Sequence, residues 1–576
     1  MPGWRRVVPV LWSVLLAALA LGPALGPGYV LSYDMVWVPD LALRPDILGV
    51  GSGLPRAVPS DTVVAVLDEI VPGMLLQKVA LLGALAGGGL GILRLAPRKS
   101  LTGQLVAVSV YQWNPFVAER LVLGHWPLLV GYAVLPWLVL AAREWRTTGV
   151  LPWRLCWLVP LGSLSASAGL ATGVVLVAFA AERRVRRWAV TAALLAVGNA
   201  PWLVSGLLHA ADATTDPAGA SAFALHSEGV LPAPVAALGL GGIWNAEVVP
   251  ASRDGLLGWL SVLALLGLAA AGLRGLRAHL GRRDQLAFIG CVVVAWLAAV
   301  LTWAVPSAMT WTVSHLPGAG LLRDGTRILA VAAPGLALAV GHGAARLTAA
   351  LRHAAPAAPA TAGLALVLAL VLLPLALLPD LGFGVSGRLG AVGYPDGYAR
   401  ARAVVSARQD VGASGDVVLL PFSSYRQPVW NGGRKVLDPM GRYLTPDYLA
   451  GADLLVSDVR IAGEDPRARA AVRVLARPTP EARSRGLAAL GIRFAVTDLD
   501  VPGAPRVAGR ALMPETGRIQ VQDLADSLAR RAERANRKRA RNRSRSPSQA
   551  AAPRTRSAPI RQQRSSRFDR FLRWFR

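Results

Sequence analysis

Eight long apolar stretches limit what this chain can fold into more than any other feature. A helix that rises about 1.5 Å per residue needs roughly 20 apolar residues to cross about 30 Å of hydrocarbon. Apolar side chains make up 53% of the 576 residues, which leaves room for many such helices. The strong stretches are residues 7–25, 72–93, 126–142, 188–208, 256–273, 286–305, 328–347 and 362–379. We therefore expect a mainly α-helical protein that crosses the cell membrane many times.

Two weaker apolar regions decide the topology. Residues 101–113 are short for a span, whereas residues 155–181 are long and interrupted by a Gly- and Ser-rich segment at 162–169. Arg and Lys concentrate in short cytoplasmic loops. If the first region crosses and the second is a two-legged hairpin, every short basic loop lies on the same side as Arg5 and Arg6. This gives about 11 helices with a cytoplasmic N-terminus. The outward loops are then 26–71, 114–125, 209–255 and 306–327.

The first apolar stretch could instead belong to a cleaved signal peptide, since Arg5 and Arg6 precede it. Its length and the lack of a clean small-x-small cleavage site favour an uncleaved first helix. The remaining topology is the same in both cases.

After the last strong stretch the sequence becomes typical of a soluble α/β module. Residues 417–422 and 494–497 are short runs like buried strands, and residues 466–490 have helical spacing. About 140 residues are enough for a hydrophobic core. The helix count places this module outside the cell. The predicted division is a membrane core at 1–383, an extracytoplasmic module at 384–525 and a basic tail at 526–576.

The tail carries more than half of the net charge of +27. Residues 530–576 contain 17 Arg and Lys residues against Glu533 and Asp569. This composition is typical of a disordered polybasic segment. Beside a bilayer it favours binding to anionic lipid or polymer over nucleic acid, although a solvated tail without a specific partner stays open. Apolar residues on one helical face at 568–575 predict a short interfacial helix.

Charged groups in the predicted outward loops are the candidates for chemistry. Such groups are costly near a bilayer unless they are solvated or paired, and they often mark a site. The first loop holds Asp34 and Asp40, the loop at 114–125 holds Arg120 and His125, and the last loop holds Arg323. A carboxylate can take a proton from a hydroxyl group, and cations can stabilise a departing phosphate.

This layout resembles the GT-C class of integral membrane glycosyltransferases. The resemblance is carried by the acidic residue after the first helix, by short helices around Asn-Pro-Phe-Val-x-x-Arg-Leu-x-x-Gly-His at 114–125, and by the trailing module. It covers about residues 1–510, and similar architecture occurs in envelope arabinofuranosyl- and mannosyltransferases of high-GC bacteria. The class generally uses a polyprenyl-phosphate sugar donor at the outer face. The resemblance therefore implies transfer to an envelope glycan or lipid acceptor.

Site roles follow from this hypothesis. Asp34 is the predicted general base. Arg120, His125 and Arg323 are candidates to hold the donor phosphate, since a guanidinium matches phosphate oxygens and imidazole can donate a hydrogen bond. Arg120 could equally pair with Glu119.

Asp40, Arg323 and Arg327 each have more than one possible role. Asp40 could bind a divalent metal, position the acceptor or pair with Arg44. Its distance of six residues from Asp34 is wider than in the acidic pairs of the class, so the need for a metal stays open. Arg323 and Arg327 could instead hold the module through Asp324.

Two other function classes stay open. A lipid-linked-sugar transporter or flippase would place ionisable groups near the bilayer midplane and often show internal repeats, of which we see few signs. A non-catalytic envelope assembly scaffold would keep the same architecture. No phosphate-binding Gly-rich loop, zinc-ligand spacing or nucleophile elbow stands out, which argues against an ATP-driven pump and a serine hydrolase.

Overall fold

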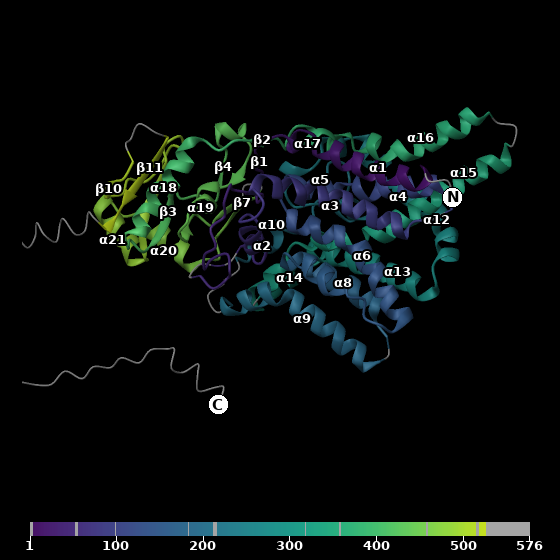
Figure 1. Cartoon of the computed structure of the whole chain (residues 1–576), viewed down its shortest axis with the longest axis horizontal. Helices are drawn as coiled ribbons and strands as arrows, with labels where there is room; N and C mark the ends of the chain where they lie inside the picture. Colours follow the sequence, from purple (N-terminus) through teal and green to yellow (C-terminus); the bar gives the residue numbers. More distant parts are fainter. Residues whose placement is uncertain are drawn as a thin grey trace, which may run out of the picture. The chain divides into compact units, whose positions relative to one another are not determined.

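The computed structural model describes most of the chain up to residue 525 (Figure 1). The described residues are 4–51, 54, 56–97, 99–182, 184–210, 216–316, 318–355, 359–456, 459–513 and 518–525. The described residues all lie in one compact unit, Met1–Asp526. The predicted basic tail at 526–576 and its short interfacial helix lie outside the described residues.

Eleven apolar helices correspond to the predicted stretches in the described part of the chain. They are α1 (Trp4–Leu21), α3 (Gly73–Leu95), α4 (Leu101–Gln112), α6 (Trp126–Thr148), α7 (Leu155–Leu161), α8 (Ala166–Ala180), α9 (Val185–Leu208), α12 (Leu256–His279), α13 (Arg282–Ala304), α15 (Ala333–Ala354) and α16 (Ala360–Leu377). Among described residues, seven helices are long and apolar enough to cross a membrane, and the bent pair of η5 (Gly325–Val331) and α15 gives an eighth. The chain is a multi-pass membrane protein.

Three of the predicted helices are shorter than a span. The helix α4 has 12 residues, α7 has 7 and α8 has 15. At about 1.5 Å per residue none of them crosses roughly 30 Å of hydrocarbon alone. The expected number of about 11 helices is therefore met, but not every helix is a complete span.

The break inside 155–181 has a local cause. Ser165 is the N-cap of α8, and its hydroxyl accepts a hydrogen bond from the backbone N–H of Ala168 at 3.3 Å. The hydroxyl of Thr172 donates to the carbonyl of Gly162 at 2.7 Å. These two bonds satisfy backbone groups where α7 ends and α8 begins.

Small residues allow the membrane helices to approach closely. A Cβ atom at Gly272 of α12 would lie 1.9 Å from the carbonyl oxygen of Ala339 on α15. One at Gly343 of α15 would lie 2.0 Å from the carbonyl oxygen of Leu268. Glycine is thus required at both positions, as is common where membrane helices pack through their backbones.

Short elements connect these helices. They are η1 (Gly22–Leu25), α2 (Ser60–Leu67), α5 (Pro115–Val122), α10 (Ala218–Ala222), α11 (Ala233–Leu238), η2 (Ala246–Val248), η3 (Ala251–Asp254), α14 (Pro306–His315), η4 (Ala319–Leu322), η6 (Pro379–Leu381) and α17 (Gly382–Ser386). The helix α5 begins at the predicted Asn-Pro motif, because the side chain of Asn114 accepts from the backbone N–H of Val117 at 3.1 Å and Pro115 fits the first helical position. All eight of its residues are buried.

The module contains a five-stranded mixed sheet. Its order is β10 (Arg510–Ala511), β11 (Ile519–Asp523), β9 (Ile492–Asp498), β3 (Asp416–Leu420) and β6 (Tyr448–Leu449). The strands β9, β3 and β6 are parallel, whereas β10 and β11 are antiparallel to their neighbours. The helices of the module are α18 (Asp396–Asp410), α19 (Pro439–Tyr443), α20 (Pro466–Leu475) and α21 (Pro480–Ala489). The predicted helical region at 466–490 is therefore two helices, because Thr479 caps the second one.

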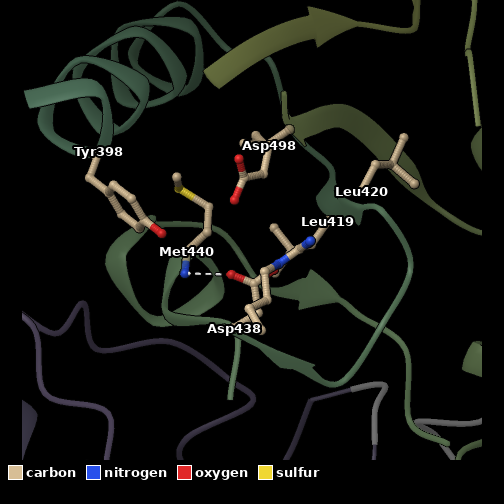
Figure 2. A pocket seen from close by; sticks show the side chains of 8 residues that line it. Tyr398, Leu419, Leu420, Asp438, Met440 and Asp498 are labelled. Atoms are coloured by element: carbon tan, nitrogen blue, oxygen red, sulfur yellow. Dashed lines mark hydrogen bonds and ion pairs between the residues drawn. The ribbon is translucent and has the colours of Figure 1, made fainter. Parts of the chain in front are cut away.

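A small pocket lies at the carboxyl ends of β3 and β9 (Figure 2). It has about 200 Å³ of empty volume. Its lining is Tyr398, Leu419, Leu420, Arg426, Asp438, Met440, Val496 and Asp498. The Asp438 carboxylate accepts from the backbone N–H of Met440 at 3.0 Å and from Nε of Arg426 at 2.7 Å. The Asp438 carboxylate in this pocket is thus already held by protein groups.

Short strands join the module to the segment that follows α1. The strand β1 (Tyr29–Val30) pairs with β2 (Ala391–Val392). The ribbon of β4 (Tyr425–Arg426) and β5 (Val436–Leu437) lies beside Tyr33, which forms a β-bridge with Val436. A further ribbon, β7 (Leu454–Val456) and β8 (Val459–Ile461), completes the described strands. The segment containing Asp34 is therefore held by backbone hydrogen bonds from the module.

Candidate functional site

The carboxylate of Asp34 lies between one residue of the module and one of the membrane core. Its Oδ1 accepts a hydrogen bond from the hydroxyl of Tyr425 at 2.5 Å, and its Oδ2 lies 3.4 Å from Nε2 of His125. The side chain of Asp34 is 45% exposed. A carboxylate oxygen has two lone pairs, so Asp34 can still accept a proton from a further hydroxyl group.

The turn before His125 requires glycine. Gly124 has a φ of +77°, and a Cβ atom there would lie 2.2 Å from the backbone nitrogen of Met35. The backbone N–H of Asp34 donates to the carbonyl of Leu123 at 3.0 Å. This close approach places His125 directly beside the Asp34 segment.

The hydrogen-bond partners of His125 determine its tautomer. Its Nδ1 lies 3.4 Å from Nη1 of Arg120. Because a guanidinium only donates, Nδ1 must accept, and Nε2 carries the proton that points to Asp34. Burial lowers the pKa of His125 below its ordinary value, although Asp34 opposes this shift. His125 is therefore a neutral donor to Asp34 near pH 7.

Asp34 itself is ionised near neutral pH. Burial raises the pKa of its carboxyl, but the hydrogen bonds from His125 and from the hydroxyl of Tyr425, together with the charge of Arg327, lower the pKa below the ordinary value. An ionised, half-exposed carboxylate is the form that a general base needs.

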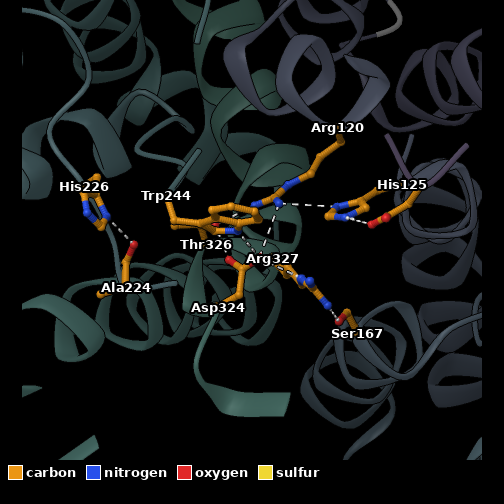
Figure 3. Close-up of polar contacts among 10 residues, drawn as sticks. Arg120, His125, Ser167, Ala224, His226, Trp244, Asp324, Thr326 and Arg327 are labelled. Atoms are coloured by element: carbon orange, nitrogen blue, oxygen red, sulfur yellow. Dashed lines mark hydrogen bonds and ion pairs between the residues drawn. The ribbon is translucent and has the colours of Figure 1, made fainter. Parts of the chain in front are cut away.

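Arg120 is buried in a polar network with the loop that leads into η5. We call Arg120, Asp324, Thr326 and Arg327 the arginine network (Figure 3). Arg120 has no exposed surface; its Nη2 donates to Oγ1 of Thr326 at 2.5 Å, and its Nη1 lies 3.5 Å from Oδ2 of Asp324. Among the described ion pairs Arg120 is therefore matched with Asp324, not with Glu119.

Asp324 is shared between both arginines of the network. Its Oδ2 also accepts from Nε of Arg327 at 2.8 Å and from Nε1 of Trp244 at 3.2 Å (Figure 3). Burial raises the pKa of Asp324, but Arg120 and Arg327 outweigh burial and lower it. With one carboxylate between two guanidinium groups, the arginine network carries one net positive charge.

Arg327 is the accessible member of the network. Its side chain is 30% exposed, and its Nη1 donates to the hydroxyl of Ser167 at 3.1 Å. Among the described residues, no protein group forms a hydrogen bond or ion pair with its Nη2. Arg327 can thus bind an anion close to Asp34.

A second buried cluster lies next to Arg120 in sequence. Glu119, Glu228 and Arg253 are all at most 1% exposed, and Nη2 of Arg253 donates to Oε2 of Glu228 at 2.9 Å. Burial and the neighbouring Glu228 raise the pKa of Glu119 well above its ordinary value. This cluster ties the loop before α12 to α5 and offers no exposed group for a substrate.

Asp40 lies in a separate acidic group. Its carboxylate is 61% exposed and pairs with Arg402 at 2.6 Å, whereas Arg44 pairs with Asp46 at 2.7 Å. Carboxylate oxygens of Asp40, Asp68 and Glu69 lie within 4.8 Å of one another, and oxygen ligands suit hard divalent cations. The donor set fits a divalent metal, but it does not include Asp34.

Arg323 binds the module instead of approaching Asp34. Its Nη1 forms an ion pair with Glu464 at 2.8 Å, and its guanidinium lies 4.3 Å from the centre of the Phe223 ring. The described contacts do not bring it to Asp34, and they attach it to the module through Glu464 and not through Asp324.

Of the five predicted site residues, the structure brings together Asp34, Arg120 and His125. Sequence reasoning did not assign Tyr425 and Asp324 to the site, and it left Arg327 with several roles. In the sequence, the only signal for Asp324 and Arg327 was the charged run at 322–327. Nothing in the local sequence connects Tyr425 with Asp34.

Comparisons with known proteins agree with this architecture. No family model and no curated protein sequence matches the chain. Among solved structures, the arabinofuranosyltransferase AftD from Mycobacteria superposes with a TM-score of 0.52 at 16% identity, covering 91% of this chain and 42% of AftD. The chain thus spans less than half the length of that protein. The oligosaccharyltransferase of Archaeoglobus fulgidus also matches, with a TM-score of 0.42, 12% identity, and 86% and 68% of the two chains covered. The mainly helical membrane core, the trailing strand-containing module and the likeness to AftD show that this chain has a GT-C-like glycosyltransferase fold.

Proposed function

We propose that this chain is a membrane glycosyltransferase. It moves a sugar from a polyprenyl-phosphate donor to an envelope glycan or lipid acceptor at the outer face of the cell membrane. The GT-C-like fold supports this function, and AftD is by its name an arabinofuranosyltransferase. The observation that carries the proposal is the ionised, half-exposed Asp34 carboxylate beside His125 and the positively charged arginine network.

In the proposed reaction Asp34 accepts the proton of the acceptor hydroxyl. The acceptor oxygen forms a bond to the anomeric carbon of the sugar, and the bond between that carbon and the phosphate oxygen breaks. The electron pair leaves with the polyprenyl phosphate, which gains negative charge. Preorganised cations are most effective where such charge develops.

The cations have different proposed roles. Arg327 contacts the phosphate because its side chain is partly exposed and its Nη2 is available. The buried Arg120 holds Asp324 and adds positive charge to the network. His125 donates to Asp34 and supports its orientation. Arg323 stabilises the position of the module through Glu464.

The acidic group of Asp40, Asp68 and Glu69 is a candidate site for a divalent metal that does not include Asp34. A divalent cation bound there would offset two of the three carboxylate charges and hold the three side chains together. The residues themselves keep the loop after Pro39 close to α2, since Asp68 also accepts from the backbone N–H of Leu41 at 2.8 Å.

The proposed topology has a cytoplasmic N-terminus and an extracytoplasmic module. Arg146 at the end of α6 pairs with Asp284 at the start of α13, so the basic ends of these helices lie together, away from the His125 end of α6. Positive charge of this kind favours the cytoplasmic side. Membrane lipids are the surrounding partner, and anionic lipid or polymer is the proposed partner of the tail.

The test is transfer of radiolabelled sugar from a panel of polyprenyl-phosphate donors in membranes that contain matched amounts of protein. We expect donor-dependent transfer by the unmodified chain and none by Asp34→Asn. The exposed carboxylate of Asp254 provides a control, and Asp254→Asn should keep its activity. Retained activity in Asp34→Asn would remove this residue from the role of base. No transfer with any donor would favour a scaffold or a lipid-linked-sugar flippase.

A further inference from the structure

The module reaches the carboxylate of Asp34 with one side chain. Tyr425 lies on β4, 391 residues after Asp34 in sequence, and its hydroxyl donates to Oδ1 of Asp34 at 2.5 Å. Among the described residues of 384–525, no other side chain forms a hydrogen bond or ion pair with this carboxylate. The orientation of Asp34 therefore depends on how the module is docked.

The backbone beside Asp34 is held in an unusual conformation by the same ribbon. Tyr33 has a φ of +44°, which a side chain other than glycine rarely adopts. Its N–H donates to the carbonyl of Lys435 at 2.7 Å, and its carbonyl accepts from the N–H of Leu437 at 2.8 Å. Its hydroxyl also donates to Glu247 at 2.5 Å. Conformations of this kind persist where the surroundings determine them, and they concentrate at functional sites.

A third contact comes from α19. Nη1 of Arg442 donates to the carbonyl of Val36 at 3.2 Å and lies 3.5 Å from the carbonyl of Asp34. Module groups thus hold Asp34 on its side chain and on the backbone at both of its sides.

We propose that the β4–β5 ribbon belongs to the active centre and that Tyr425 is a positioning residue, which holds the Asp34 carboxylate in the orientation that accepts the proton. This role rests on the proposed function of Asp34, whereas the contact itself does not. Two different supports flank the carboxylate, since His125 comes from the core and Tyr425 from the module. Docking of the module is therefore needed to complete the site.

The test removes only the hydroxyl, with Tyr425→Phe in the full chain. Because a displaced catalytic group can lower a rate by about 100-fold, we expect kcat to fall about 10- to 100-fold while KM for donor and acceptor changes less than about twofold. Tyr443→Phe is the control, since it removes the same atom from another module tyrosine that does not contact Asp34. Both variants should show the melting temperature of the unmodified chain within about 2 °C.

A second measurement does not depend on activity. A carbodiimide with an amine labels protonated carboxyl groups, and mass spectrometry of the peptide reports labelling of Asp34 alone. Loss of a hydrogen bond to the ionised form raises the protonated fraction, so at pH 5 we expect labelling about 3- to 10-fold faster in Tyr425→Phe. The titratable His125 and the charged Arg327 and Arg442, which also face Asp34, remain unchanged. Tyr443→Phe should label at the original rate.

Equal labelling of Asp34 in Tyr425→Phe and in the unmodified chain would overturn the proposal. So would a rise in KM without a fall in kcat. Faster labelling together with an active Asp34→Asn variant would reject Asp34 as the base while leaving the contact with Tyr425 intact. The two proposals can therefore fail separately.

Discussion

Arg442 of the module and Asp61 at the start of α2 form an ion pair of 2.8 Å, in which both side chains are about nine-tenths buried. Removing one partner of a buried pair leaves the other charge without compensation, which costs about 3–5 kcal/mol. We expect Asp61→Ala to lower the free energy of unfolding by about 3 kcal/mol, measured by denaturant unfolding in detergent. The double variant Asp61→Leu with Arg442→Met should recover most of this loss. Equal stability of the single variant and the unmodified chain would contradict the prediction.

The raised pKa of Asp447 should make the stability of the chain depend on pH. Burial and the neighbouring Asp46 raise its pKa to about 6, against an ordinary value of 3.8. The folded state therefore holds the proton more tightly than the unfolded state, so this residue favours folding below about pH 4, and that contribution is lost as the pH rises to about 6. We expect Asp447→Asn to be about 1–3 kcal/mol more stable than the unmodified chain at pH 7 and equal to it at pH 4. A difference that is the same at both pH values would show that the carboxyl does not titrate in this range.

Addition of a single methyl group at Gly124 should lower the stability of the chain sharply. Gly124→Ala places a Cβ atom 2.2 Å from the backbone nitrogen of Met35 and requires a φ of +77°. Strain and overpacking together should lower the free energy of unfolding by about 2–4 kcal/mol and displace His125 from Asp34. Gly255→Ala is the matched control, since its Cβ would meet no atom within 4 Å. Thermal unfolding of both variants would decide, and an unchanged Gly124→Ala protein would be evidence against the close contact with Met35.

Replacement of Arg327 should lower the activity of the chain without unfolding it. Replacement by Gln removes the exposed positive charge of the arginine network, and we expect kcat/KM for the polyprenyl-phosphate donor to fall about 100-fold, a typical cost of one charge-stabilising group. Arg518→Gln, at a side chain 68% exposed, should leave transfer unchanged. An equal, small effect of both substitutions would show that Arg327 does not bind the donor.

The fold was predictable from the sequence where the physics is local. The length of the apolar stretches located the membrane helices, and the short strand-like runs after the last of these stretches located the module. The predicted mainly helical fold and its GT-C-like character are confirmed. The incomplete spans were not predictable with the same certainty. Whether a stretch such as Leu155–Leu161 crosses or turns depends on the cap at Ser165 and on the hydrogen bond from Thr172 to Gly162, which act only once the helices pack.

The candidate site was predictable only in part. Arg120 lies in the short helix that the Asn-Pro motif begins and His125 follows that helix, so their proximity follows from nearby sequence. The choice between Arg323 and Arg327 does not, because it depends on the 3₁₀ conformation of Gly325–Val331. Tyr425 was beyond prediction, since strand pairing across 391 residues leaves no local pattern.

The pairing of Tyr33 with the β4–β5 ribbon also sets an order of events during biosynthesis. The residues around Asp34 are synthesised early, but their backbone partners Lys435 and Leu437 are synthesised about 400 residues later. Until then, the segment has no strand to hold Tyr33 in its left-handed conformation. A partly translated chain inserted in the bilayer therefore lacks an organised centre, and only translation through the module completes it.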